Sequence, residues 1–181
     1  MLIYFLLFSK SDFLLIPMKQ LIIALFCLCF YLPCSSQSQN EDFMITVLKY
    51  NIKEQTYIFG EWNPSDNQSE IHLNYLGDIE TSDATKYKIM TSSRYWGPTK
   101  KITNKILVFD RNHNFLGNYY LNTKCELPTQ IVDNQLIFKP VECTNCSYSI
   151  TKVDFHNGIP ENFYLGCRPG LGSLYSFYLS I

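Results

Sequence analysis

The middle of the chain alternates between short apolar runs and polar turns, and this alternation constrains the fold more than any other feature. Residues 106–109 and 115–121 are rich in β-branched and aromatic side chains, which favour strands. The polar segment between them, residues 110–114, has the composition of a turn. The pattern therefore predicts a β-hairpin, and a second one follows with strands at residues 130–132 and 136–138.

The composition extends this prediction to the whole domain. Tyr and Phe each occur 13 times, whereas Ala, the best helix former, occurs twice. No segment shows a convincing amphipathic helical pattern. We therefore expect an all-β fold, a single antiparallel β-sandwich or small barrel-like meander of about ten strands. Beyond the two hairpins, strands are expected at residues 43–52, 57–59, 70–76, 87–90, 148–155, 163–165 and 175–181, and loops at 77–85, 92–104 and 166–172.

The stretch from Ile106 to Phe138 resembles one blade of a β-propeller. It runs from an apolar strand through an Asp-containing turn to a Phe-Leu-Gly strand, and then through Leu-Pro to another strand. A propeller requires at least four such blades, and the sequence contains no second copy. The resemblance therefore implies a meander of antiparallel strands and not a propeller.

The first 36 residues have the pattern of an export segment. Met18 and Lys19 precede an apolar run at residues 21–32, and small residues follow at the expected cleavage site. This pattern predicts a signal peptide that starts at Met18. A membrane-spanning anchor is the alternative, but the run is shorter than the ~20 residues that a span needs. Cys34 is a candidate site of lipid attachment, although the bulky residues before it depart from the lipoprotein pattern.

Removal of the export segment leaves a flexible arm at residues 37–42 and a β-domain at residues 43–181. The expected location is outside the cytoplasm, in the periplasm, at the cell surface or in the extracellular space. Thirteen basic and fifteen acidic residues remain in this part, and a near-neutral balance argues against a nucleic-acid partner. We expect no integral membrane span in the mature chain and no cofactor.

Four cysteines remain after the export segment, and an even number in an exported protein indicates two disulfides. Four cysteines allow three connectivities. We favour one bond between Cys125 and Cys167 and another between Cys143 and Cys146. The Cys143-Thr-Asn-Cys146 spacing leaves two alternatives open, a redox pair and half of a zinc site. We expect no metal.

Aromatic residues in or beside the expected loops are the candidate binding residues. Trp62 lies near one loop, and Arg94, Tyr95 and Trp96 lie together in another. Exposed rings of this kind can stack on a sugar or anchor a protein partner. Packing at the end of the core is the alternative interpretation.

Asp154 and His156 are the weak candidates for catalysis. Their spacing would place a carboxylate and an imidazole on the same face of a strand. No Gly-x-Ser-x-Gly motif accompanies them to supply a nucleophile. The sequence therefore favours a non-enzymatic module at the cell envelope, with a protein or glycan as its partner. The alternative is a small extracytoplasmic hydrolase that uses Asp154 and His156.

Overall fold

The computed structural model describes residues 38–139, 146 and 150–180, and the predicted export segment, including Cys34, lies outside them. The described part is mostly β, as predicted. Its elements are α2 (Ser38–Tyr50), β1 (Thr56–Phe59), β2 (Glu70–Glu80), β3 (Lys86–Trp96), β4 (Lys101–Asp110), β5 (Phe115–Leu121), the short 3-10 helix η1 (Lys124–Glu126), β6 (Gln130–Val132), β7 (Gln135–Phe138), β8 (Thr151–Asp154), β9 (Asn162–Arg168) and β10 (Leu171–Leu179).

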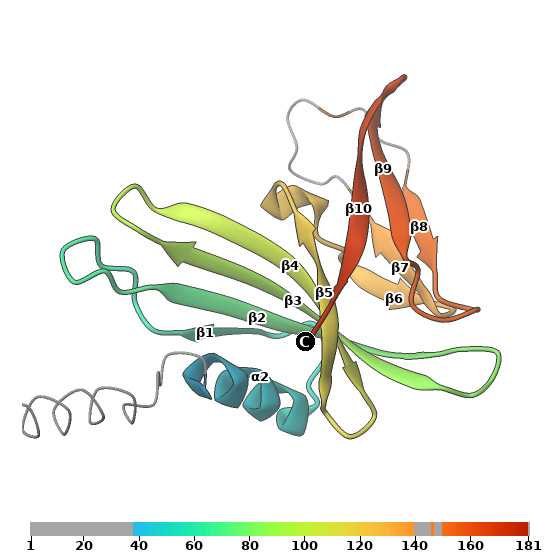
Figure 1. Ribbon diagram of the computed structural model, residues 1–181, viewed down its shortest axis with the longest axis horizontal. Coiled ribbons are helices and arrows are strands. Elements are labelled where there is room, and N and C mark those ends of the chain that lie inside the picture. The colour runs from blue at the N-terminus through green and yellow to red at the C-terminus, as the bar shows by residue number, and fades with distance from the viewer. Residues whose placement is uncertain (1–37, 140–145, 147–149, 181) are drawn as a thin grey trace, which may run out of the picture. The chain divides into compact units, whose positions relative to one another are not determined.

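The strands form two antiparallel sheets (Figure 1). Seven strands pair in the order β1-β2-β3-β4-β5-β10-β9, and three pair in the order β6-β7-β8. The arrangement is sandwich-like, which confirms the predicted fold class. The stretch that resembles a propeller blade is divided, because β4 and β5 lie in the large sheet whereas β6 and β7 lie in the small one. It therefore does not form a single blade.

Each face of the large sheet covers its own apolar core. On one face, Ile89 and Val108 pack with Leu136 of β7 and with Phe155, which directly follows β8, so this core includes the small sheet. On the other face, α2 packs against the side chains of β2, β3 and β4. Alternate residues of one strand therefore contribute to two different cores, and the helix and the small sheet lie on opposite faces of the large sheet.

The prediction of a strand at residues 43–52 is wrong, because residues 43–50 belong to α2 and residues 51–52 follow its end. Val47 and Leu48 are buried against the sheet, and Phe43 and Met44 pack beside them one turn earlier. This spacing gives a helix one apolar stripe, and the burial outweighs the strand preference of β-branched residues. The helix also includes residues 38–42, where the sequence predicted a flexible arm. No helix of the described residues is long and apolar enough to cross a membrane.

The strands of the large sheet are longer than the sequence predicted. Strand β2 continues past a bulge between Tyr75 and Gly77 as far as Glu80, into a segment expected to be a loop. The predicted connection at residues 92–104 is mostly strand, because β3 and β4 pair as far as Trp96 and Lys101. Only residues 97–100 form the turn between them. Polar residues on these strands concealed their length.

Gly117 allows β5 to approach β10 closely. Its φ of 154° lies in the region that favours glycine, and a Cβ atom at this position would overlap the carbonyl oxygen of Tyr178. Strand β5 pairs with β10 at this point, with Gly117 opposite Leu179. The approach joins the C-terminal hairpin to the meander, so any larger residue at this position would push the two strands apart.

The disulfide pairing differs from the prediction. Cys146 is bonded to Cys167, with a Cα–Cα distance of 4.6 Å, whereas we expected Cys167 to pair with Cys125. Cys125 is also disulfide-bonded, and Cys143 lies outside the described residues. The sequence separation of 21 between Cys146 and Cys167 corresponds to roughly 3 kcal/mol of stabilisation in the chain-entropy model. The disulfide at Cys146 argues against the alternative hypothesis that Cys143 and Cys146 form half of a zinc site.

Candidate functional site

The strand geometry of β3 divides the predicted Arg94, Tyr95 and Trp96 cluster. These residues end β3 and do not lie in a loop. Successive side chains of a strand point to opposite faces. Arg94 and Trp96 line a cleft on the face that carries α2, whereas the Tyr95 ring contacts His72 on the other face, at a centroid distance of 5.0 Å. The three residues that were predicted to form one site therefore lie on opposite faces of the sheet.

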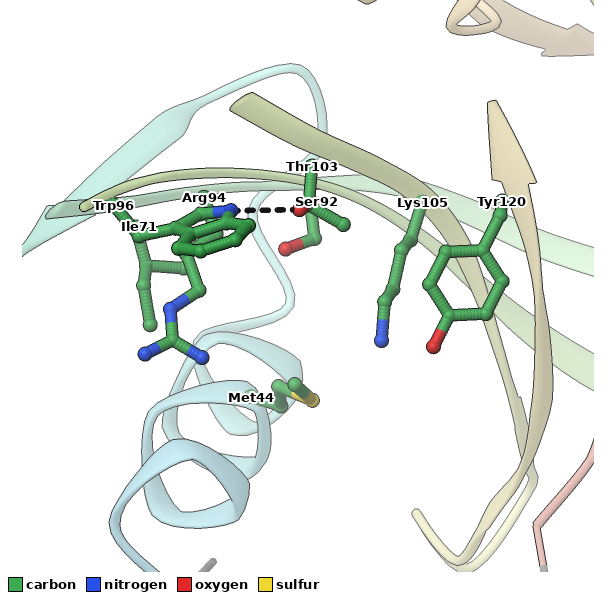
Figure 2. A pocket seen from close by; sticks show the side chains of 8 residues that line it. All are labelled: Met44, Ile71, Ser92, Arg94, Trp96, Thr103, Lys105 and Tyr120. Carbon is green, nitrogen blue, oxygen red and sulfur yellow. Dashed lines mark hydrogen bonds between the residues drawn. The ribbon is translucent and has the colours of Figure 1, made fainter. Parts of the chain in front are cut away.

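The cleft beside α2, which we call the helix-side cleft, has a volume of about 420 Å³. This volume falls in the range of ~300 to 1,000 Å³ that is typical of small-molecule sites. None of its lining residues is acidic. They come from the helix and four strands and are Met44, Ile71, Ser92, Arg94, Trp96, Thr103, Lys105 and Tyr120 (Figure 2).

One side of the helix-side cleft is formed by Arg94 and Trp96. The indole N–H of Trp96 donates a hydrogen bond to Thr103 Oγ1 at 2.9 Å, and this bond fixes the plane of a ring that is 41% exposed. The Arg94 guanidinium donates to Ser69 Oγ at 3.2 Å. Both side chains are held in place from the sheet, and both remain accessible to a ligand.

The other side is formed by Lys105 and Tyr120, which face each other across the β4–β5 pair. The ammonium of Lys105 lies 4.5 Å from the centroid of the Tyr120 ring, a cation–π contact. Tyr120 in turn makes an edge contact with Tyr178 of β10, at 5.6 Å between centroids. This stack of residues from three adjacent strands orients the Lys105 ammonium.

Trp62 lies with Tyr95 around Lys100. The Lys100 ammonium is 4.8 Å from the Trp62 ring centroid and 5.4 Å from that of Tyr95. The indole N–H of Trp62 donates to the carbonyl oxygen of Gly97 at 2.9 Å. These contacts clamp the loop before β2 onto the β3–β4 turn. Trp62 is half-buried, so its contacts fit a structural role better than a binding role.

The face of the sheet that carries Tyr95 and His72, opposite α2, has a second cavity, which is polar and has a volume of about 300 Å³. Asn74 Oδ1 is buried there without a hydrogen-bond partner. The neighbouring Glu70 accepts a hydrogen bond from the His72 ring at 2.5 Å, and this bond lowers the pKa of the Glu70 carboxyl. The cavity is lined by Thr56, His72, Asn74, Thr91, Ser93, Lys124, Leu127, Pro128 and Thr129.

The structure places Asp154 and His156 together in a turn at the end of β8. Strand β8 ends at Asp154, and the backbone N–H of His156 donates to Asp154 Oδ1 at 2.8 Å. The carboxylate thus closes a local turn in which the buried Phe155 lies between the two residues. Neither side chain lines the helix-side cleft or the polar cavity. Among the residues that the structure describes, no group of three His, Cys, Asp or Glu could hold a metal ion.

Sequence reasoning identified one side of the helix-side cleft and missed the other. Lys105 and Tyr120 lie on predicted strands or at their ends, but nothing in the sequence marks them as neighbours of Trp96. The strand register brings them together, because Arg94 is opposite Thr103 and Lys105 is opposite Tyr120. The alternation of residues 101, 103 and 105 along one face of β4 was the available signal.

Comparison with known proteins finds no matching family, no curated protein of significantly similar sequence and no solved structure that matches.

Proposed function

We propose that this chain is an exported, non-enzymatic binding domain of the cell envelope, with a protein or glycan ligand that occupies the helix-side cleft. The observation that carries the proposal is the lining of this cleft. Two exposed aromatic rings and two cationic side chains surround one opening, and binding sites commonly combine apolar walls with a few placed polar groups. Export rests on the pattern of residues 18–36 in the sequence.

The two tryptophans provide a direct test of the site. Purified domain and its variants would be applied to a glycan array and to an envelope extract, and their thermal unfolding would be recorded. Trp96→Ala should abolish or strongly weaken binding and change the melting temperature little, because Trp96 is 41% exposed and lies outside both apolar cores. Trp62→Ala is the matched control, and it should lower the melting temperature while folded protein still binds.

Two outcomes would contradict the proposal. One is a wild-type domain that retains no glycan and no envelope protein. The other is a Trp96→Ala variant that binds as well as wild type. Export has its own test, which is fractionation of cells followed by the intact mass of the purified protein. A chain that remains in the cytoplasm with residues 18–36 attached would rule out the envelope location.

A further inference from the structure

The cationic residues at the helix-side cleft and its rim lack the carboxylate partners that two lysines at the start of β3 possess, among the residues that the structure describes. Lys86 pairs with Glu80 at 3.1 Å, and Lys88 pairs with Asp78 at 3.2 Å. Among the described residues, no ion pair involves the cationic residues at the cleft, which are Arg94, Lys101 and Lys105. Three positive charges on one small surface repel one another, so an anion that enters there meets a favourable potential.

The arrangement of these groups suits a single anionic substituent. Figure 2 shows the Arg94 guanidinium and the Lys105 ammonium extending from the sheet in the same direction, with the hydroxyl groups of Ser92 and Thr103 between them. Thr103 accepts the Trp96 indole N–H, so its own proton is available to a ligand oxygen. A carboxylate or sulfate between the two cations would therefore find further donors at the floor of the cleft.

A saccharide fits the rest of the cleft better than a peptide does. Strands β3 and β4 are paired on both sides, so they offer no free edge to which a peptide strand could add. The floor presents hydroxyl groups, and Trp96 presents a ring to the solvent. Sugars are recognised by this combination, because their C–H faces stack on aromatic rings while their hydroxyl groups exchange hydrogen bonds.

We infer that the ligand of the helix-side cleft is an acidic saccharide, whose carboxylate or sulfate is bound by Arg94 and Lys105 while a sugar ring lies against Trp96. Lys101, whose ammonium lies 5.4 Å from the Trp96 ring centroid, adds positive charge at the rim. The inference rests on the proposed binding function and narrows it to one class of ligand.

Isothermal titration calorimetry with defined oligosaccharides tests this inference. The probes are a short oligouronate, the same oligomer with its carboxyl groups reduced to alcohols, and a sulfated oligosaccharide of equal length. An acidic probe should bind at least tenfold more tightly than the reduced oligomer, and its affinity should fall as salt is added. The uronate and sulfate arms distinguish the two sources of negative charge.

Charge-removing variants locate the anion. Arg94→Gln and Lys105→Gln should each weaken binding of the acidic probe at least tenfold and leave binding of the reduced oligomer unchanged. Lys88→Gln is the matched control, because Lys88 lies on β3 but has a carboxylate partner, and it should bind as wild type does. The melting temperature of each variant confirms that it is folded.

Failure of this inference is distinguishable from failure of the proposed function. Equal affinity for the acidic and reduced oligomers, or unchanged binding by both glutamine variants, would overturn the acidic saccharide. If a neutral glycan or an envelope protein then bound in a manner that Trp96→Ala abolished, the binding function would stand with another ligand. If no probe, glycan or envelope protein bound to the wild-type domain, both would be wrong.

Discussion

Strand β3 carries cationic side chains at both ends, and only one end supplies them with carboxylates. At its beginning, Lys86 and Lys88 lie opposite Glu80 and Asp78 of β2 and pair with them. At its end, Arg94 lies opposite Ile71 of β2. On the face that carries α2, the near-neutral net charge of −1 therefore conceals an uneven distribution of charge, with carboxylates beside the lysines at one end of β3 and no ion pair at Arg94 among the described residues.

The apolar centre between the two ends should dominate stability. Leu107 lies opposite Met90 and is buried in the core beneath α2. Leu107→Ala should lower the free energy of unfolding by about 2 to 5 kcal/mol, because it leaves a cavity. Denaturant unfolding measures this change. Ile102→Ala, on the same strand but exposed, is the control and should change stability by no more than about 0.5 kcal/mol. Similar losses of unfolding free energy in both variants would show that the buried centre of the sheet does not dominate stability.

We call the end of β3 with Lys86 and Lys88 the paired end, and the end with Arg94 the cationic end. A carboxylate placed at the cationic end should make it resemble the paired end. Thr103 lies opposite Arg94, so Thr103→Glu would give Arg94 an internal partner. We expect binding of an acidic oligosaccharide to weaken at least tenfold, or by about 1.4 kcal/mol, as measured by calorimetry. Thr103→Gln also removes the hydroxyl group but adds no charge, so it should weaken binding less than Thr103→Glu does. Equal losses in the two variants would mean that the hydroxyl group matters and the charge does not.

The paired end should respond to alkaline pH. Tyr75 donates a hydrogen bond to Asp78 at 2.7 Å, and burial together with this carboxylate raises the pKa of the Tyr75 phenol. The unfolded chain would ionise its tyrosines from about pH 10, before the folded chain does. Stability should therefore be full below this pH and decline above it. Tyr75→Phe should decline less steeply in urea titrations between about pH 9 and about pH 11.

Two other tyrosines should maintain some loss of stability at high pH in the Tyr75→Phe variant. Burial raises the pKa of Tyr175 to about 12, and burial also raises the pKa of Tyr119. The Tyr75→Phe protein should consequently still lose stability at high pH, but less than wild type. An identical slope in both proteins would show that Tyr75 titrates alike in the folded and unfolded chains.

The smallest effect is expected from breaking an ion pair at the paired end. The Lys86 and Glu80 side chains are both about half exposed, and exposed ion pairs contribute less than about 1 kcal/mol. Glu80→Gln should therefore change the free energy of unfolding by less than that amount and leave affinity for an acidic oligosaccharide unchanged. Thermal unfolding and calorimetry measure the two quantities. A gain of tenfold or more in affinity would indicate that charge anywhere on β3, and not the cleft itself, governs binding.

Strands bounded by strong turn residues could be predicted from the sequence, and strands bearing polar residues could not. Strands β5 and β6 begin and end where the sequence indicated, because apolar runs meet polar turns there. The last residues of β3 and the first residues of β4 pair with each other. Their strand structure was missed because Ser93 and Asn104 resemble loop residues. In the structure both are buried, and Ser93 Oγ donates to Asn104 Oδ1 at 2.9 Å. A buried polar pair on adjacent strands leaves no apolar pattern to detect.

Only one side of the candidate site could be predicted from the sequence, for a related reason. Arg94 and Trp96 stood out because a cationic and an aromatic residue lie close together in the sequence. Their separation from Tyr95 required the knowledge that β3 extends to residue 96. The partnership of Lys105 with Tyr120 required the register of β4 and β5, and the pairing of Cys146 with Cys167 required the relative positions of distant segments. Long-range register is the information that local patterns lack.

The position of α2 in the chain has a consequence for the order in which the domain assembles. Synthesis proceeds from the N-terminus, so α2 is complete before any strand that it covers. Val47 and Leu48 cannot be buried until Met90 and Leu107 have been added and paired, since a short isolated helix is marginally stable in water. Met44, which lines the helix-side cleft, thus reaches its place only when the helix docks on a formed sheet. The part of the cleft that is synthesised first therefore depends on strands that are synthesised after it.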